Sequence, residues 1–294
     1  MKVKEPMAVK EPMAVKEPMA FTKGCEDVLP RAEGSQTKNI MKSIMDEDRG
    51  EIIKRYDNNV RGKELDTSSK NKKHCGKEGH CLEEAMGIKP NGKNEPDIFG
   101  YEMKNDTKVG VTTFIDKEPD YFNIRGENFK GISKKCNKVK KEELWNNMYR
   151  QNTRKQGEKR IGGWKVNKWD IDGQMLSVCE DNSMTVVYNY EKDTRKYKDD
   201  CLEDFYKDGK DHIILKWEKK TLETFINRKF NQNGFFICKI DKICFGKPIT
   251  FDMWIQGVKE GIIYYDGYSE LNGRWRGCFR AKNDFWHSLI TEEY

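Results

Sequence analysis

The stretch Gly79–Lys104, GHCLEEAMGIKPNGKNEPDIFGYEMK, joins a short helical pattern to a strand that carries charged residues. Leu82 and Met86 lie one helical turn apart, and Gly87 follows as a residue type that commonly ends helices. The next residues form a turn cluster rich in Asn, Gly and Pro. The last eight residues predict a strand. We therefore expect a helix, a turn and a strand in this order.

The strand has the form P-D-x4-E-x-K, with Asp97, Glu102 and Lys104 as its charged members. Magnesium is a hard cation that proteins hold through one or two carboxylates together with substrate phosphate and water. Glu102 and Lys104 share one face of a strand, where Lys104 could orient a water that attacks phosphorus. Asp97 lies five residues before Glu102, so on a regular strand it would face the opposite side of the sheet. A turn or bulge at Phe99–Gly100 must therefore bring its side chain to the side of Glu102 and Lys104. The alternative is an edge strand whose charges face water.

The whole stretch resembles the catalytic segment shared by the mismatch-repair endonuclease MutH and the restriction endonucleases MvaI and BcnI. In these PD-(D/E)xK enzymes, a G-x-x-L-E helix ends in a Gly-hydrophobic stop, and a Gly-containing turn leads to the Asp and the E-x-K strand. Thr112–Phe114 resembles the strand that follows, whereas Met103-Lys104-Asn105 replaces the commoner Leu/Ile-Lys-Thr. The helix pattern is filled here by Gly79, Leu82, Glu83, Gly87 and Ile88.

The resemblance implies a mixed α/β fold (α+β) with a PD-(D/E)xK restriction-endonuclease-like core and a sheet-rich C-terminal recognition lobe. It implies Mg²⁺-dependent hydrolysis of double-stranded DNA, with Asp97 and Glu102 as metal ligands and Lys104 serving the attacking water. Glu83 would be an accessory acid that holds a second metal, a metal-bound water or Lys104. Glu84 is the alternative if the helix register slips.

A type II restriction endonuclease is the function that these residues favour. The resemblance also implies a protein that acts as a monomer, and a cognate DNA methyltransferase that protects host DNA without a stable complex. One alternative is a MutH-like mismatch-repair nicking endonuclease, which is directed by a partner protein. An alternative of another class is a non-catalytic DNA-binding regulator that depends on zinc.

Two His-Cys pairs, His74-Cys75 and His80-Cys81, are candidate zinc ligands. Structural zinc sites usually draw ligands from separated pairs, with a chelating loop between the members of each pair. Adjacent residues point to opposite sides of a strand and about a quarter-turn apart on a helix. We therefore predict ordinary roles, with Cys81 as a small buried apolar group and His74 at the surface.

Two regions are candidates for DNA contacts. The stretch Tyr264–Arg280 predicts a hairpin with Asn272-Gly273 at its turn, and arginines on such a ribbon can bond guanine in the major groove. Between Lys130 and Arg160, eleven Lys and Arg stand against three Glu, a local balance of +8 that suits the DNA backbone. The alternatives are arginines in salt bridges and a solvated basic surface. The predicted DNA-binding residues are Tyr268, Asn272, Arg274, Arg276, Arg280, Lys134 and Lys135.

The composition fits an intracellular protein with wide polar surfaces. Of the 294 residues, 36% are hydrophobic and 35% are charged, and the net charge is +6. No apolar run is long enough to cross a membrane, and no apolar core of a secretory signal is present. Nine cysteines without framework spacing fit a reducing compartment. We expect a cytoplasmic location without membrane attachment.

Three parts are expected along the chain. Residues 1–35 are a disordered tail and linker, because 1–20 repeat a six-residue Pro-containing unit without an apolar face. Residues 36–160 form a catalytic lobe with the basic DNA-facing segment, which starts with helices interrupted near Gly50. Residues 161–294 form a sheet-rich lobe that completes the core and carries DNA-recognition loops. The predicted elements of this lobe are strands at 163–171, 174–180, 184–190, 212–217, 234–240 and 261–268 and a helix at 218–230.

Overall fold

The structure of the protein is a computed structural model. It describes residues 33–64, 77–89, 94–105, 110–123, 148–151, 159–195, 200–269 and 275–294. The chain divides into two compact units, residues 1–44 and 45–294. The second unit contains all the strands, and strand β5 (Lys159–Trp164) runs across the expected boundary at residue 160. The division into a catalytic and a recognition lobe stays a prediction, and the repeat tail lies outside the described residues.

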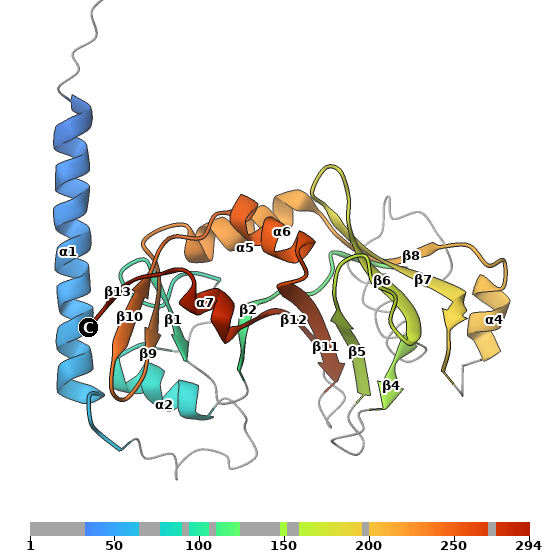
Figure 1. The fold of residues 1–294 in the computed structure, drawn as a ribbon, viewed down its shortest axis with the longest axis horizontal. Coiled ribbons are helices and arrows are strands. Elements are labelled where there is room, and N and C mark those ends of the chain that lie inside the picture. The colour runs from blue at the N-terminus through green and yellow to red at the C-terminus, as the bar shows by residue number, and fades with distance from the viewer. Residues whose placement is uncertain are drawn as a thin grey trace, which may run out of the picture. The chain divides into compact units, whose positions relative to one another are not determined.

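The strand that carries Glu102 and Lys104 belongs to a four-stranded sheet, sheet A, that joins both halves of the sequence (Figure 1). Its order is β1-β9-β10-β13, in which β1 and β9 are parallel and the other neighbours are antiparallel. The strands are β1 (Tyr101–Asn105), β9 (Gly234–Cys238), β10 (Ile243–Gly246) and β13 (Ile290–Glu293). The predicted catalytic segment is therefore held by a strand from the second half of the chain.

One face of sheet A packs on two helices from the first half of the chain. Helix α1 (Glu33–Asn59) buries Ile52 and Tyr56, and helix α2 (Lys77–Ala85) buries Leu82 against the same cluster. The predicted interruption near Gly50 is wrong, because α1 is continuous there. A glycine inside a helix costs only about 1 kcal/mol, and burial of the following apolar side chains outweighs this cost.

Helix α2 ends where the sequence predicted. Gly87 has φ +74°, its N–H donates to the Glu84 carbonyl at 3.0 Å, and the Ile88 N–H donates to the Glu83 carbonyl at 2.8 Å. This pair of bonds is the Schellman arrangement, in which a left-handed glycine closes the last turn.

Two antiparallel sheets complete the second unit. Sheet B has the order β2-β12-β11-β5-β4 and sheet C has the order β3-β8-β7-β6. Their remaining strands are β2 (Val111–Asp116), β3 (Tyr121–Phe122), β4 (Arg150–Gln151), β6 (Asp172–Val178), β7 (Met184–Asp193), β8 (His212–Trp217), β11 (Ile263–Ser269) and β12 (Trp275–Lys282). The other helices are α4 (Asp200–Tyr206), α5 (Lys219–Phe230), α6 (Phe251–Lys259) and α7 (Asn283–His287). The predicted mixed α/β class is confirmed, as is the helix at 218–230. Among the described residues, no helix has the length and apolar character to cross a membrane.

One predicted strand, at 163–171, is mostly wrong. Strand β5 ends at Trp164, and Asn167 adopts a left-handed φ of +53°. The Asp170 carboxylate accepts the backbone N–H groups of Asp172 and Gln174 at 2.9 and 3.0 Å. An aspartate that bonds nearby backbone groups offers the chain an alternative to a sheet ladder. The segment is therefore a loop in spite of its strand-like composition.

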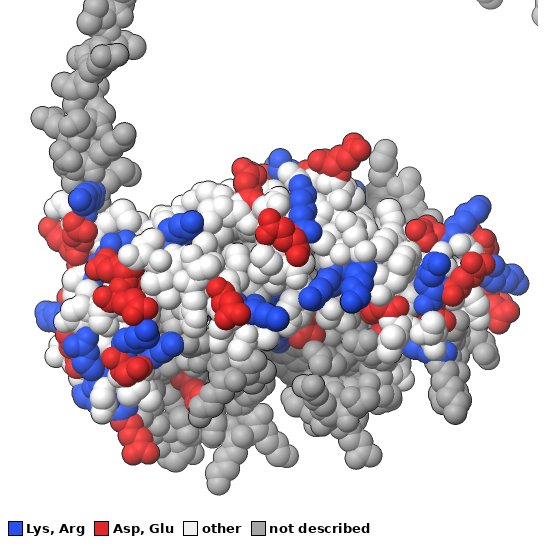
Figure 2. Space-filling model, viewed as in Figure 1, with Lys and Arg blue, Asp and Glu red and all other residues white. Residues whose placement is uncertain are grey.

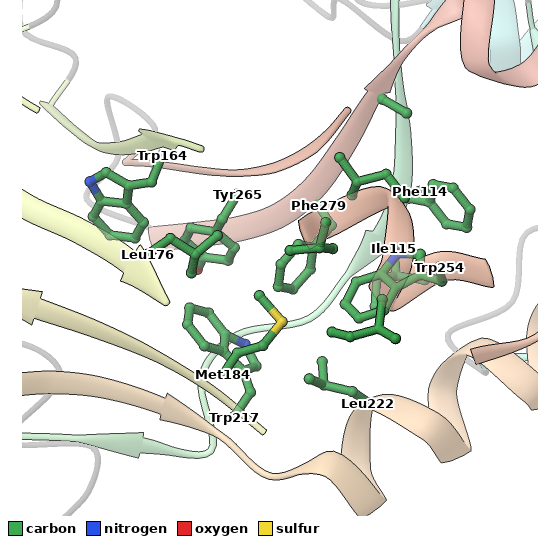
Figure 3. Close-up of a cluster of buried hydrophobic side chains, with 14 of the residues drawn as sticks. Phe114, Ile115, Trp164, Leu176, Met184, Trp217, Leu222, Trp254, Tyr265 and Phe279 are labelled. Atoms are coloured by element: carbon green, nitrogen blue, oxygen red, sulfur yellow. The ribbon is translucent and has the colours of Figure 1, made fainter. Parts of the chain in front are cut away.

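Aromatic side chains from sheets B and C and from α6 meet in the main core (Figure 3). The Tyr265 ring lies 5.4 Å from the Trp164 ring and 4.8 Å from the Trp217 ring. Trp254 of α6 contacts Phe279 of β12 at 5.0 Å. This cluster ties the β11–β12 hairpin to sheet C.

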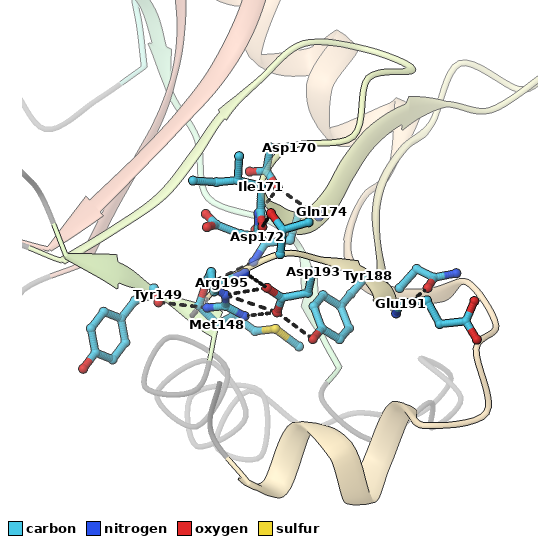
Figure 4. A network of polar contacts seen from close by, with 12 residues as sticks. Met148, Tyr149, Asp170, Ile171, Asp172, Gln174, Tyr188, Glu191, Asp193 and Arg195 are labelled. Carbon is cyan, nitrogen blue, oxygen red and sulfur yellow. Dashed lines mark hydrogen bonds and ion pairs between the residues drawn. The ribbon is translucent and has the colours of Figure 1, made fainter. Parts of the chain in front are cut away.

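A polar network fixes Met148 and Tyr149, two residues of the basic segment, onto sheet C (Figure 4). The Arg195 guanidinium donates to the Tyr149 carbonyl at 3.0 Å, and the Gln174 amide donates to the Met148 carbonyl at 3.1 Å. Asp193 pairs with Arg195 at 2.5 Å and accepts the Tyr188 hydroxyl at 2.9 Å. Burial alone would raise the pKa of Asp193, but the bonds and charge of Arg195 hold it below the usual range.

A pair of substitutions tests the packing of the hairpin. The Tyr265 hydroxyl is buried, has no hydrogen-bond partner among the described residues, and would overlap any Cβ at Gly277. We expect Tyr265→Phe to raise the free energy of unfolding by about 1 kcal/mol and Gly277→Ala to lower it by about 1–3 kcal/mol. Urea unfolding measures both.

Tyr188→Phe is the matched control, because its hydroxyl is bonded to Asp193. It should lower the free energy of unfolding by about 1 kcal/mol. A loss of stability in Tyr265→Phe as large as in this control would contradict the assignment of an unpaired hydroxyl.

Candidate active site

A tight turn brings Asp97 beside the start of β1. Phe99 and Gly100 have φ of +47° and +73°, and the Asp97 N–H donates to the Tyr101 carbonyl at 2.9 Å. Two consecutive left-handed residues are typical of a type I′ turn. One Asp97 carboxylate oxygen then accepts the Met103 N–H at 2.9 Å. The predicted turn at Phe99–Gly100 is confirmed, and it brings the Asp97 side chain to the strand from which Glu102 and Lys104 project.

Asn233, the residue before β9, holds this turn in place. Its side-chain amide donates to the Phe99 carbonyl at 2.8 Å, and its backbone N–H donates to the Gly100 carbonyl at 3.0 Å. The closest atoms to a Cβ built at Gly100 are those of Asn233 and Gln232, so a larger residue would be crowded as well as strained. The geometry of Asp97 therefore depends on a residue from the second half of the chain.

Glu102 is the most buried charged group of the site, with 3% of its surface exposed. One carboxylate oxygen, Oε1, lies 2.7 Å from the Lys104 ammonium and 3.0 Å from the ammonium of Lys229 in α5. The second oxygen, Oε2, is buried and has no hydrogen-bond partner among the described residues. The predicted common face of Glu102 and Lys104 is confirmed by their direct contact.

The two carboxylates influence each other. Burial and the negative charge of Glu102 raise the pKa of Asp97 to about 7, against the opposing effects of Lys104, the Met103 N–H and Lys229. A carboxyl group close to another negative charge resists ionisation until a cation arrives. Lys104 and Lys229 therefore offset only part of the effect of burial and of Glu102 on Asp97.

These groups suit a hard divalent cation. Glu102 offers a buried acceptor without a partner, and Asp97 offers a second carboxylate beside it. Within the described part of the chain, no three or more His, Cys, Asp or Glu side chains are gathered into a metal cluster. Two carboxylates with substrate phosphate and water make up a coordination shell that is common for Mg²⁺.

Glu83 is placed differently from the other three. It lies on α2, its carboxylate is 3.1 Å from the His80 ring, and 31% of its side chain is exposed. The structure does not gather it with Asp97 and Glu102, so its accessory role stays a prediction. Cys81 is buried, as expected, whereas His74 and Cys75 lie outside the described residues.

The predicted hairpin is confirmed, with Tyr268 opposite Arg276 in the β11–β12 register. Arg280 lies 2.8 Å from the Asp266 carboxylate and donates to the Thr113 hydroxyl at 3.3 Å. It therefore takes part in a salt bridge, which was the alternative for the hairpin arginines. The predicted DNA-binding residues Asn272, Arg274, Lys134 and Lys135 lie outside the described residues. On the face seen in Figure 2, described Lys and Arg alternate with Asp and Glu.

Comparison with known proteins identifies the family of the chain. The sequence model of the LlaMI restriction endonuclease family matches residues 60–294. The chain belongs to this family. It is 32% identical over 268 residues to the type II restriction enzyme ScrFI of Lactococcus lactis subsp. cremoris, with 84% of this chain and 99% of that protein covered. The predicted function of a type II restriction endonuclease, a DNA-cleaving hydrolase, is confirmed at the level of this family.

A solved structure supports the fold. The restriction endonuclease MvaI in complex with its cognate DNA substrate matches with a TM-score of 0.53 at 12% identity, covering 85% of this chain and 97% of that one. At this identity the likeness concerns the fold alone. The predicted restriction-endonuclease-like architecture is confirmed.

The raised pKa of Asp97 predicts a pH effect on the metal-free protein. A folded state that binds a proton more tightly than the unfolded chain loses stability as pH rises through the folded pKa, here about 7. In EDTA, the free energy of unfolding of the wild type should therefore fall between about pH 4 and pH 7 relative to that of Asp97→Asn, and should level off above pH 7. Urea unfolding across this range measures the difference, with the exposed Asp204→Asn as control. Parallel pH profiles for the wild type and Asp97→Asn would contradict the assignment.

Proposed function

We propose that the chain is a site-specific endonuclease that uses Mg²⁺ to hydrolyse phosphodiester bonds in double-stranded DNA. The observation that carries the proposal is the buried Glu102 carboxylate beside Asp97, with one oxygen shared by Lys104 and Lys229 and the other without a partner. A buried carboxylate oxygen without a partner is costly unless a cation or a hydrogen-bond donor joins it.

Each residue then has a separate role. Asp97 and Glu102 hold the cation, which supplies Lewis acidity and lowers the pKa of water when bound. Lys104 orients the attacking water and stabilises the negative charge that develops on the phosphate. Lys229, which the sequence did not single out, balances the charge of Glu102 and fixes its orientation. Glu83 serves as the accessory acid if α2 moves closer when DNA binds.

Double-stranded DNA is the proposed substrate, since the MvaI relative of this fold was solved with its cognate DNA. We also propose that one chain acts alone, because the candidate catalytic residues and the β11–β12 hairpin both lie in its second unit. A cognate DNA methyltransferase would protect the same site without forming a stable complex. Tyr268, Arg276 and the hairpin turn would contact bases, and Lys134 and Lys135 would contact the backbone.

Substitutions at the site should separate cleavage from binding. Glu102→Gln and Lys104→Ala should each slow cleavage about 100-fold or more while leaving DNA affinity within a few-fold, because neither residue reads bases. Lys229→Met should slow cleavage less, since Lys229 orients Glu102 and does not act on the attacking water. Glu83→Gln and its exposed neighbour Glu84→Gln form a matched pair, of which only the first should reduce the rate. Single-turnover cleavage and fluorescence anisotropy give the two readouts.

Supercoiled plasmid is the substrate of choice for this assay. A wild-type monomer that cuts the strands in turn should produce a nicked intermediate, and chelation of Mg²⁺ should stop both steps. Near-normal cleavage by Glu102→Gln or Lys104→Ala, or cleavage by the wild type in EDTA, would contradict the proposed active site.

A further inference from the structure

The Lys104 ammonium has neighbours that are not needed to neutralise it. Besides its contact with Glu102, it lies 5.2 Å from the centre of the Phe230 ring and 5.6 Å from the centre of the Trp286 ring. Both distances are within the range of about 6 Å in which a cation is attracted to the face of an aromatic ring. Only 10% of the Lys104 side chain is exposed, so water competes weakly with these contacts.

The two rings are fixed by the main core. Phe230 ends α5 and Trp286 lies in α7, and their exposures are 0% and 1%. The Phe114 ring lies 4.8 Å from Phe230 and 4.4 Å from Trp286, and Phe235 of β9 contacts Trp286 at 5.2 Å. A ring packed on several sides cannot follow a moving ammonium. The pair is therefore a rigid surface, whereas the lysine side chain is flexible.

The proposed mechanism asks Glu102 to do two things. It pairs with Lys104 in the metal-free site, and it binds the cation during catalysis. Its attraction for Lys104 then weakens, while the cation repels the ammonium. A lysine side chain that its partner attracts less strongly regains rotamer entropy and leaves its position more easily. Some other contact must then keep Lys104 near the phosphate.

We propose that Phe230 and Trp286 form a seat that holds the Lys104 ammonium by cation–π contact when Glu102 binds the metal. They are positioning residues, since they act on the reaction through Lys104. The proposal rests on the proposed function, because it assigns Glu102 to the cation. It explains why two aromatic rings from different helices flank the one lysine of the P-D-x4-E-x-K motif.

The contact can be observed without activity. Protons above an aromatic ring are shielded, so the Lys104 ε-methylene signal of a lysine-labelled sample should lie upfield of exposed lysines, with Lys104→Arg providing the assignment. Addition of Mg²⁺ alone should leave the signal upfield in the wild type. In Trp286→Leu plus Mg²⁺, the signal should move to the position of exposed lysines.

Cleavage rates provide the second readout. Trp286→Leu should slow single-turnover cleavage about tenfold at saturating Mg²⁺ with unchanged DNA affinity, and Trp286→Phe should recover most of the rate because its ring keeps a negative face. Trp254 is the matched control, because it is also fully buried and packs on Phe279 without a lysine. Trp254→Leu should lower the free energy of unfolding by about as much as Trp286→Leu does. It should leave the Lys104 signal and the cleavage rate unchanged.

Two results would overturn the seat. One is a wild-type Lys104 signal that moves to the position of exposed lysines when Mg²⁺ is added. The other is equal loss of rate in Trp286→Leu and Trp254→Leu, which would mean that buried bulk alone matters. A wild type that keeps the upfield signal but does not cleave DNA would instead overturn the proposed function and support the seat.

Discussion

The arrangement of the site depends on one buried carboxylate, that of Glu102. Moving an ionised carboxylate away from water is costly, and the cost is tolerated only where cations and hydrogen bonds compensate. Here the compensation comes from Lys104 on the same strand and from Lys229 at the end of α5, both on one oxygen. The other oxygen is left as an open acceptor. This oxygen is the place where we propose that the cation binds.

The fold supplies these partners from distant parts of the sequence. Strand β1 pairs in parallel with β9, and α5 and Asn233 lie immediately before β9 in the chain. The pairing that sets the register of Glu102 therefore also brings Lys229 and the turn-holding Asn233 to the site. Strands β9 and β10 of sheet A also pack into the main core with sheets B and C, which carry the β11–β12 hairpin and, through Arg195, Tyr149 of the basic segment. The predicted catalytic and DNA-facing elements thus share one packed framework.

Local patterns made part of this predictable. The Gly87 stop, the turn at Phe99–Gly100 and the shared face of Glu102 and Lys104 follow from backbone preferences over a few residues, and all three are confirmed. The Asn272-Gly273 signal correctly predicted a hairpin. Such features need no knowledge of the tertiary structure.

Other features depend on contacts between segments that are far apart in the sequence. Lys229 is one of several lysines on its helix, and nothing local marks it as the one that meets Glu102. Helix α1 continues through Gly50 because Ile52 and Tyr56 are buried against sheet A, and the loop at 163–171 is set by the bonds of Asp170. Phe230 and Trp286 look like ordinary core residues until the path of β1 places Lys104 beside them.

The central claim is that Asp97 and Glu102 together hold the cation of a DNA-cleaving site. Anomalous diffraction from crystals of the protein with Mn²⁺ and duplex DNA tests this claim most directly. We expect an anomalous peak about 2.1 Å from a carboxylate oxygen of each residue, with Oε2 as the oxygen that Glu102 contributes. A peak at the His-Cys pairs, or no peak at the two carboxylates, would contradict it.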